Sequence, residues 1–255
     1  MDLGLDGKRA LVGGGAGGIG GGIAGVLAAE GARLVLVGRT AATLQARGAE
    51  LGAGTCVADL ATREGPGAAV AEAVGQLGGL DLLVVNSGGP PPGTFEAIDE
   101  EEWERAIEGT LQSTLRLIRA ALPHLREGGD PAIVINLSSS VREPLPGLTT
   151  SNVLRPGLAG LIKNLAFEIV PIRINGVAPG RFDTARVAQL DGKRAEASGQ
   201  SMEAVRREAE ARIPLGRYGD TAEIGRVASF LLSPAASYVT GAIVPVDGGL
   251  VRALP

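Results

Sequence analysis

Short runs of β-branched and aliphatic residues alternate along the chain with longer stretches of helical periodicity. The runs that predict β-strands occupy residues 9–12, 34–37, 55–57, 80–85, 132–137, 172–177 and 242–246. Several of these runs are apolar at every position, which is typical of strands with both faces covered. Between them, apolar stripes at i, i+3 or i+4 spacing predict amphipathic helices, as at Leu154, Leu158, Leu161, Leu165 and Ile169.

This order of elements predicts an α/β fold. Repeated strand–helix–strand units make the strands parallel and place helices on both faces of one sheet. The sequence contains no internal repeat and no obvious linker, so we expect residues 1–255 to form a single doubly wound, Rossmann-type domain. The least patterned region, 181–212, is rich in Ala, Glu and Arg. We interpret it as a mobile helical insertion that can serve as a substrate lid.

The amino-acid composition and the net charge argue against several classes of protein. A hydrophobic content of 45% over 255 residues suits a globular chain with a sizeable core. The net charge of −4 argues against a surface for nucleic acid or anionic membranes. The single cysteine, Cys56, cannot form an internal disulfide, and no Cys and His cluster offers a metal site. We therefore expect a cytoplasmic protein without nucleic-acid, membrane or metal partners.

The first predicted strand runs directly into a glycine-rich corner. Residues 13–20 read GGGAGGIG, and an amphipathic helical pattern follows them. A strand that turns into a helix over glycines lets the backbone approach a pyrophosphate closely. The helix N-terminus then presents free N–H groups and the positive end of its dipole. The corner therefore predicts a dinucleotide site, and the alternative is a flexible glycine-rich turn.

The residues after the second predicted strand bear on the choice of cofactor. An acidic residue at that point accepts hydrogen bonds from a ribose 2′-hydroxyl, whereas a basic residue pairs with a 2′-phosphate. Here the strand is followed by Gly38-Arg39-Thr40, with no carboxylate in reach. The planar fork of Arg39 suits a phosphate. This favours NADP(H), with NAD(H) as a possible cofactor; the alternative is that Arg39 is a solvated loop residue.

Several motifs in order resemble those of the short-chain dehydrogenase/reductase family, over almost the whole chain. Gly14-x-x-x-Gly18-x-Gly20 is similar to its glycine motif, although Gly13 stands where Thr is usual. The later motifs are Asp59-Leu60, Asn86-Ser87-Gly88, Asn175 with Pro179-Gly180 and Thr184, and a C-terminal segment from Pro214 to Gly249. That last segment resembles the pattern of β-ketoacyl carrier-protein reductases.

The resemblance implies the strand order 3-2-1-4-5-6-7 and a homotetramer or homodimer. It also implies hydride transfer between a nicotinamide and a small-molecule carbonyl, acyl or alcohol substrate, as in 3-oxoacyl reductases. The positions implied to bind the cofactor are Gly14, Gly17, Gly18, Ile19, Gly20, Asp59, Leu60, Asn86, Gly88, Pro179, Gly180 and Thr184, beside Arg39. In the family a Tyr exchanges the hydroxyl proton, and a Lys four residues later lowers its pKa and binds ribose. A Ser holds the substrate oxygen, and an Asn supports a water relay.

The chain departs from this pattern at the Tyr and Lys positions. Its two tyrosines, Tyr218 and Tyr238, are each followed four residues later by alanine, so no Tyr-x-x-x-Lys occurs. Aligning the helix that contains Leu154 puts Ser151 at the Tyr position and Arg155 at the Lys position.

The remaining two positions follow from the same alignment. The Asn position falls on Thr110, and counting three residues from Asn136 selects Ser139 as the Ser. Ser138 and Ser140 are alternatives to Ser139. Ser139, Ser151 and Arg155 are therefore the candidate catalytic residues.

These replacements change the chemistry. An aliphatic alcohol is a far weaker acid than a phenol of pKa about 10, so Ser151 is a poor general acid. The loss of such an acid typically costs about 10²–10⁴ in rate. Arg155 keeps the positive charge and can stabilise a developing alkoxide, although it cannot shuttle a proton. The alternatives are that Ser151 is a helix cap or a packing residue, and that Pro156 directs Arg155 away from the site.

Two functions from different classes fit these patterns. The first is an NADP(H)-dependent oxidoreductase of the short-chain class with altered proton transfer. The second is a dinucleotide-binding sensor or oligomeric scaffold without turnover. They differ in whether an added ketone consumes NADPH. A Rossmann-like methyltransferase would leave the Pro-Gly-Thr and Asp-Gly-Gly segments unexplained.

Overall fold

Seven parallel strands form one sheet at the centre of the molecule. The computed structural model describes residues 2–253, and within them the strand order is β3-β2-β1-β4-β5-β6-β7, as expected. The strands are β1 (Arg9–Gly13), β2 (Arg33–Gly38), β3 (Gly54–Val57), β4 (Leu82–Val85), β5 (Ala132–Asn136), β6 (Arg173–Pro179) and β7 (Ile243–Val246). Every predicted strand is present, and the doubly wound α/β fold is confirmed.

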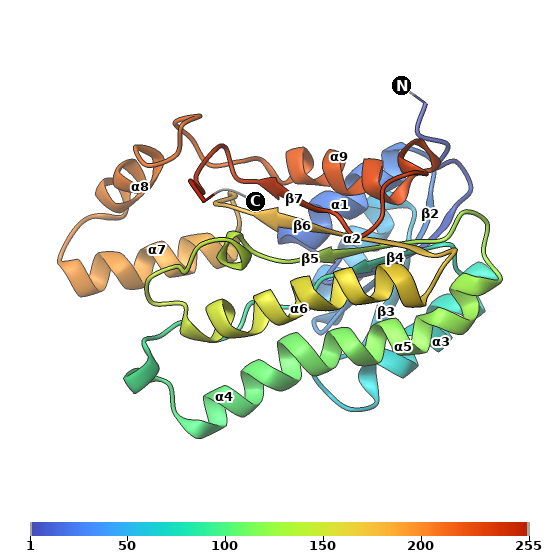
Figure 1. Ribbon diagram of the computed structural model, residues 1–255, viewed down its shortest axis with the longest axis horizontal. Helices are drawn as coiled ribbons and strands as arrows, with labels where there is room; N and C mark the ends of the chain where they lie inside the picture. The colour runs from blue at the N-terminus through green and yellow to red at the C-terminus, as the bar shows by residue number, and fades with distance from the viewer. Residues whose placement is uncertain (1, 254–255) are drawn as a thin grey trace.

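Helices cover both faces of the sheet (Figure 1). One face carries α1 (Gly18–Ala29), α2 (Ala41–Leu51) and α9 (Thr221–Leu232), and the other carries α3 (Gly65–Leu77), α4 (Glu100–Ala106), α5 (Ser113–Arg126) and α6 (Thr149–Glu168). A separate cluster of buried aliphatic side chains fills each side of the sheet. A π-helical turn, η2 (Ile107–Gln112), joins α4 to α5, and the short turns are η1 (Phe95–Ala97), η3 (Ser139–Val141) and η4 (Pro234–Ala236). Within residues 2–253, none of the helices is long and apolar enough to cross a membrane.

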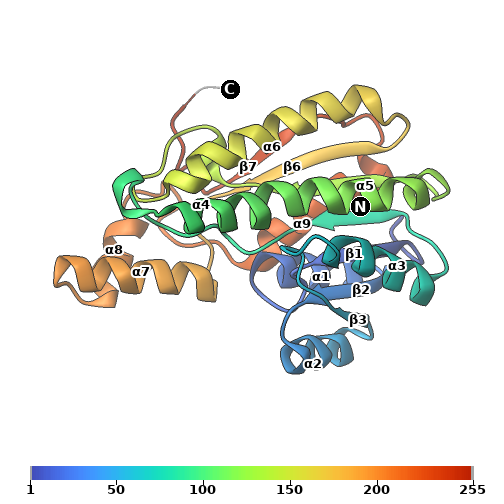
Figure 2. The same ribbon diagram turned by 90° about the horizontal axis from the view of Figure 1, so that it is seen from below.

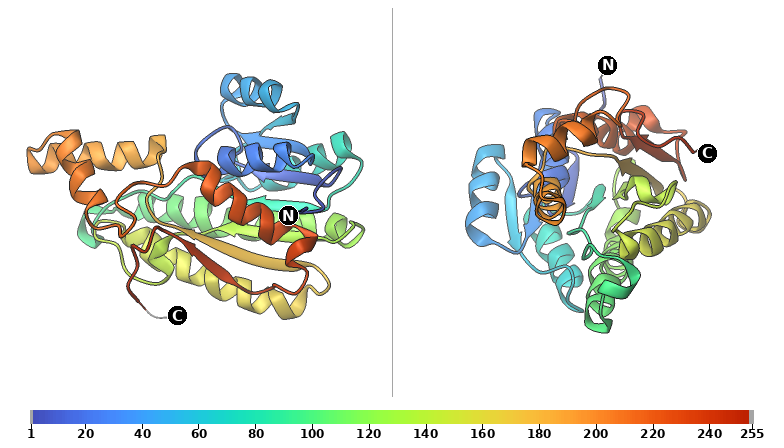
Figure 3. Two further views of the ribbon diagram at one scale, coloured as in Figure 1. Left: turned by 90° about the horizontal axis from the view of Figure 1, so that it is seen from above. Right: turned by 90° about the vertical axis from the view of Figure 1, so that its left-hand side faces the viewer.

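Two helices project beyond the carboxyl ends of the strands (Figures 2 and 3). They are α7 (Ala185–Ser198) and α8 (Met202–Glu210), and they make up most of the segment 181–212 that was predicted to be helical. The hydroxyl of Tyr218 donates to Asp191 at 2.8 Å, and Arg181 pairs with the same carboxylate. Arg206 of α8 lies over the Tyr218 ring at 4.5 Å from its centre. Burial and the bond to Asp191 raise the pKa of Tyr218 to about 12, so this tyrosine is a structural donor at neutral pH.

The backbones of helices α1 and α9 approach each other closely. A Cβ atom at Gly22 would lie 2.4 Å from the carbonyl oxygen of Thr221, and one at Gly225 would lie 2.7 Å from the carbonyl oxygen of Gly22. Only glycine permits so close an approach of two helices. Part of the glycine content therefore serves helix packing, and this packing orients the N-terminus of α1 at the carboxyl edge of the sheet.

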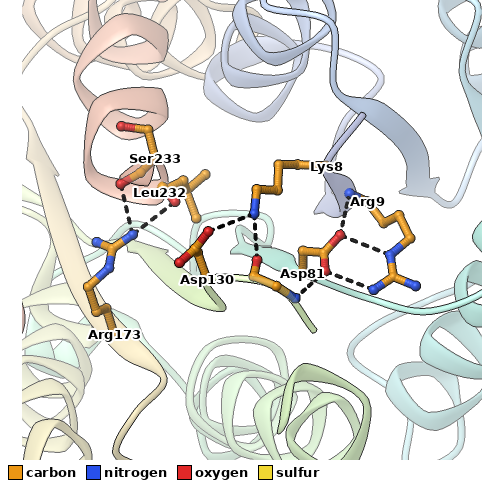
Figure 4. A network of polar contacts seen from close by, with 8 residues as sticks. Lys8, Arg9, Asp81, Asp130, Arg173, Leu232 and Ser233 are labelled. Atoms are coloured by element: carbon orange, nitrogen blue, oxygen red, sulfur yellow. Dashed lines mark hydrogen bonds and ion pairs between the residues drawn. The ribbon is translucent and has the colours of Figure 1, made fainter. Parts of the chain in front are cut away.

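A network of hydrogen bonds and ion pairs lies at the opposite edge of the sheet, where the strands have their amino ends (Figure 4). Asp81 accepts hydrogen bonds from the backbone N–H, Nε and Nη2 of Arg9 at 2.8–2.9 Å and from the N–H of Gly129 at 2.8 Å. Lys8 pairs with Asp130 at 3.1 Å. Arg173 donates to four carbonyl groups at the end of α9 and in the following turn η4, which belong to Leu231, Leu232, Ser233 and Ala236. These bonds fix the strands at the end remote from the predicted site.

Candidate active site

The turn between β1 and α1 presents bare backbone at the carboxyl edge of the sheet. Gly14 and Gly18 have φ of +59° and +55°, a region that favours glycine. A Cβ atom at Gly14 would lie 2.6 Å from Nδ2 of Asn86, and one at Gly20 would lie 2.4 Å from the carbonyl oxygen of Gly14. Helix α1 begins at Gly18 without a side-chain cap. Its first N–H groups are therefore available to an anion.

The predicted nicotinamide segment lies beside this corner. Thr184 is the N-cap of α7, and its hydroxyl accepts from the N–H of Val187 at 3.3 Å. The Cγ2 atom of Thr184 lies 3.9 Å from the position that a Cβ of Gly18 would take. Pro179 ends β6, and the N–H of Gly180 donates to the carbonyl oxygen of Val246 at 3.0 Å. The fold thus brings together two motifs that are far apart in the sequence.

The predicted adenosine segments follow β2 and the edge strand β3, which pair with each other. Arg39 is exposed directly after β2. Asp59 follows β3, and its Oδ1 accepts from the N–H of Ala61 at 3.0 Å, while Leu60 packs partly against the core. Because Gly38 of β2 pairs with Val57 of β3, both segments lie at the same edge as the glycine corner.

Two asparagine amides connect the ends of three strands. Nδ2 of Asn86 donates to the carbonyl oxygen of Gly13 at 3.0 Å, and its Oδ1 accepts from Nδ2 of Asn136 at 2.8 Å. The backbone of Gly88 has open space beside it, since a Cβ there would meet no atom within 4 Å. The ends of β1, β4 and β5 are therefore held in register next to the corner.

The three serines after β5 take different positions. The Oγ of Ser138 accepts from the N–H of Ser140 at 3.1 Å and so caps η3. The Oγ of Ser140 lies 3.0 Å from the Oγ of Ser151, which belongs to the first turn of α6. Ser139 is 4% exposed, and residues 2–253 provide no hydrogen-bond partner for its hydroxyl. Ser139 thus has an unengaged hydroxyl at this point.

Ser151 does not cap a helix, so that interpretation is wrong. The N-cap of α6 is Leu148, and the helix continues through Pro156 to Glu168 without interruption. The hydroxyl of Ser151 instead faces Ser140 across the β5–α6 connection. Tertiary packing, and not local capping, therefore decides the environment of this side chain.

Arg155 is buried within the same cluster. Its Nη1 donates to the backbone carbonyl of Asn136, and burial lowers the pKa of its guanidinium to about 10. Among residues 2–253 it forms no ion pair, and Nε lacks a partner, as do Oδ1 of Asn136 and Oγ1 of Thr110. Buried polar atoms without partners are uncommon, and they mark places where water or a ligand supplies the bond. Thr110 lies in the π-helical turn η2, a feature frequent at functional sites.

A proline-rich segment forms the rim above this cluster. Residues 90–92 are all proline and follow the Asn86 motif. The hydroxyl of Thr150 donates to the carbonyl oxygen of Pro91 at 2.7 Å, and the N–H of Gly93 donates to the carbonyl oxygen of Gly147 at 2.8 Å. The rim is thereby attached to the start of α6, next to Ser151.

Two features of this region are absent from the sequence predictions. One is the contact of Ser140 with Ser151, which joins residues from two elements and leaves no local pattern. The other is Arg186, whose Nη2 donates to the carbonyl oxygen of Pro90 at 2.6 Å. Its only signal in the sequence is a basic residue two positions after Thr184, in the first turn of a predicted helix.

Known proteins match this chain over nearly its full length. The profile of a family described as "Enoyl-(Acyl carrier protein) reductase" matches residues 14–251. Dehydrogenase/reductase SDR family member 4 of Sus scrofa is 34% identical over 263 residues, which cover 98% of this chain and 89% of that protein.

Solved structures show the same similarity. L-sorbose reductase from Gluconobacter frateurii, complexed with NADPH and L-sorbose, matches with a TM-score of 0.94 at 30% identity and 100% coverage of both chains. The NADPH-bound short chain oxidoreductase from Pseudomonas aeruginosa PAO1, described as containing an atypical catalytic center, matches with a TM-score of 0.87 at 28% identity. That match covers 98% of this chain and 100% of the other.

Proposed function

The chain belongs to the short-chain dehydrogenase/reductase family of NAD(P)-dependent oxidoreductases, and from this premise we propose that it reduces a small-molecule carbonyl with NADPH. The observation that carries the proposal is the open N-terminus of α1, set against Thr184 across a corner built from glycines. The two solved structures described above both contain NADPH, which supports the choice of the phosphorylated cofactor. As in β-ketoacyl reductases, 3-oxoacyl compounds are the first substrates to test.

The residues present fit such a cofactor. Gly14 and Gly20 have no room for a side chain, and Gly18 leaves the backbone open beside Thr184, so the corner suits a pyrophosphate against the backbone. The other residues that would hold the cofactor are Gly17, Ile19, Arg39, Asp59, Leu60, Asn86, Gly88, Pro179, Gly180 and Thr184. When bound, NADPH supplies the hydride.

The catalytic roles follow from the buried cluster. Ser139 would hold the substrate oxygen with its unengaged hydroxyl. Ser151 and Arg155 stand in place of the family's Tyr and Lys, so the proton for the product alkoxide comes from water held at Ser151 and Thr110. The buried charge of Arg155 stabilises that alkoxide, because charge interactions are strong where water is excluded. Helices α7 and α8, within the segment 181–212, act as the lid.

We expect Ser151→Tyr combined with Arg155→Lys to raise turnover about 100-fold, since a phenol beside a cation restores a general acid. The measurement is NADPH oxidation with a panel of ketones and 3-oxoacyl thioesters. Cofactor titration and a melting curve should show that the variant folds and binds NADPH. Unchanged turnover in such a variant would mean that these two residues do not limit catalysis. If the native chain binds NADPH and consumes none with any carbonyl, the alternative of a sensor or scaffold applies.

We expect Arg39→Ala to weaken NADPH binding about tenfold and to leave NADH binding unchanged, because a charge-assisted bond to the 2′-phosphate is lost. Fluorescence titration with each cofactor measures both affinities. Arg119→Ala is the matched control, since Arg119 is exposed on α5. Equal effects on NADPH and NADH would refute the selective role of Arg39.

We also propose that the chain forms a homotetramer or homodimer through α6. Phe167 is 86% exposed near the end of that helix, and Val153 and Val170 are exposed as well. Apolar exposure of this kind is typical of an interface between subunits. Phe167→Glu should therefore shift the molecular mass in light scattering toward the monomer, whereas Val57→Glu on the edge strand should not. An unchanged mass would exclude this face. The cytoplasmic location stays a prediction.

A further inference from the structure

The side chain of Arg186 joins two segments that follow different strands of the sheet, β4 and β6. It belongs to the first turn of α7, which follows β6, yet its Nη2 donates to the carbonyl oxygen of Pro90 in the segment after β4. Strand β5 lies between β4 and β6 in the sheet. The next residue of the proline segment, Pro91, accepts from the hydroxyl of Thr150, which precedes Ser151. The bond of Arg186 therefore joins α7 to the rim of the cluster that contains Ser140 and Ser151.

This guanidinium carries a charge that no carboxylate balances. Its partners within residues 2–253 are neutral oxygens, Pro90 O at 2.6 Å and Gln189 Oε1 at 3.3 Å. The side chain is half-buried, and burial lowers its pKa. Removing an arginine from water without an anionic partner costs free energy. An anion placed beside it would recover that cost.

The position of Arg186 also opposes the local electrostatics of α7. The first turn of a helix is the positive end of its dipole, and a cation there is unfavourable by about 0.3–1 kcal/mol. The guanidinium packs closely against the backbone of Gly89, where a Cβ would lie 3.2 Å from Nε of Arg186. A residue that is unfavourable for its own helix, as a cation is in the first turn, is expected mainly at a functional site.

Two further arginines belong to segments next to the end of β5. Arg155 is bonded to the carbonyl oxygen of Asn136, the last residue of that strand. Arg142 directly follows η3, three residues after Ser139, and is half-buried. Neither forms an ion pair within the part of the chain that the structure describes. Arg142, Arg155 and Arg186 thus carry positive charges without ion pairs in a chain whose net charge is −4.

We propose that Arg186 binds the carboxylate of an anionic carbonyl substrate, which makes small keto acids the substrate class of the proposed reductase. This proposal rests on the proposed function. A planar guanidinium accepts a carboxylate in a bidentate manner and so orients the rest of the molecule. With the acid group on Arg186, the ketone would be directed to the hydroxyl of Ser139. When bound, NADPH would supply the hydride for the new C–H bond, the carbonyl π electrons would move to oxygen, and water would protonate that oxygen. The products are a hydroxy acid, NADP⁺ and hydroxide.

The test compares acids with their esters. For 2-oxo and 3-oxo acids and for their methyl esters, NADPH oxidation is measured in the native chain, in Arg186→Gln and in Arg207→Gln. Arg207 is exposed on α8 and controls for the loss of a charge on the lid. We expect Arg186→Gln to lower kcat/KM for the acids about 100-fold and for the esters less than threefold. The affinity for NADPH and the melting temperature should not change.

Three results would overturn the proposal. An equal loss on acids and esters would assign Arg186 to closing the lid through its bond to Pro90. A loss of NADPH affinity would assign it to a cofactor phosphate. Equal activity of the native chain on acids and esters would show that no carboxylate is recognised.

A binding measurement separates this proposal from the reductase activity itself. Oxamate and malonamate carry an amide in place of the ketone of 2-oxo and 3-oxo acids, so they bind without being reduced. Calorimetry with the native chain, with and without NADP⁺, should show binding that is at least about tenfold weaker in Arg186→Gln. If no carbonyl consumes NADPH but this binding is found, the proposed function fails and the anion site stands. If neither compound binds the native chain, the anion site is refuted.

Discussion

Gly18→Ala is expected to weaken NADPH binding by about 30- to 150-fold, or roughly 2–3 kcal/mol, while the protein still folds. Gly18 is the first residue of α1, and a Cβ there would point toward Thr184, with Cγ2 at 3.9 Å. In the cofactor-free protein this space is open. In the complex, the added methyl group would occupy the place where the backbone approaches the pyrophosphate.

The control for this prediction separates backbone strain from steric exclusion. Gly52 has φ of +62°, close to the +55° of Gly18, and a Cβ at Gly52 would meet no atom within 4 Å. Both alanine variants should therefore lose a similar stability of about 1 kcal/mol in urea unfolding. Only Gly18→Ala should lose affinity in a fluorescence titration with NADPH. If Gly52→Ala weakens binding equally, the corner is not the cofactor site.

Asp81→Asn is expected to lower the free energy of unfolding by about 3 kcal/mol, because it breaks a largely buried ion pair and leaves Arg9 without its carboxylate. Asp81 is 5% exposed and accepts four hydrogen bonds that join β1, the start of β4 and Gly129 (Figure 4). Asp130→Asn is the matched control, since Asp130 pairs with Lys8 at the surface and should contribute less than about 1 kcal/mol. Urea unfolding at neutral pH measures both values, and similar losses would contradict the assignment.

We expect the carboxylate of Asp81 to contribute to the loss of folding stability at acid pH. Burial favours the neutral form of Asp81, but the hydrogen bonds from Arg9 and Gly129 outweigh it and lower its pKa to about 2. A group whose pKa is lowered by folding contributes its stability above its unfolded pKa near 4 and loses it as the pH falls toward 2. The native chain should thus lose stability between about pH 4 and pH 2 more steeply than Asp81→Asn. Parallel unfolding curves for the two proteins would exclude this role.

Local sequence patterns were sufficient to predict the helices and strands and the cofactor-binding motifs. Short apolar runs such as 132–135 are typical of strands covered on both faces, and β5 lies there. The glycines of 13–20 predict a strand-to-helix corner because no other residue combines positive φ with close backbone approach. These features depend on neighbouring residues alone, so a single sequence carries them.

The environment of the candidate catalytic residues could not be predicted in the same way. The sequence leaves Ser151 open as a cap, a packing residue or a catalyst, and capping propensity alone would favour the first. In the structure its hydroxyl meets Ser140, which comes from another element. Whether Pro156 directs Arg155 away from the site was equally open, and the structure has α6 continuing through Pro156 with Arg155 bonded to the carbonyl oxygen of Asn136. Propensity is weak against the burial of a 20-residue helix on the sheet.

By itself, the sequence determined the parallel α/β sheet, the position of the glycine corner and the absence of a Tyr-x-x-x-Lys pair, because periodicity, backbone freedom and residue identity are local properties. Only the tertiary structure decided that Arg155 is buried without a carboxylate, that the hydroxyl of Ser139 makes no hydrogen bond within residues 2–253, and that Arg186 reaches Pro90 in the segment after β4. Those properties depend on which strand ends become neighbours. That arrangement follows from the packing of helices and strands that are distant along the chain.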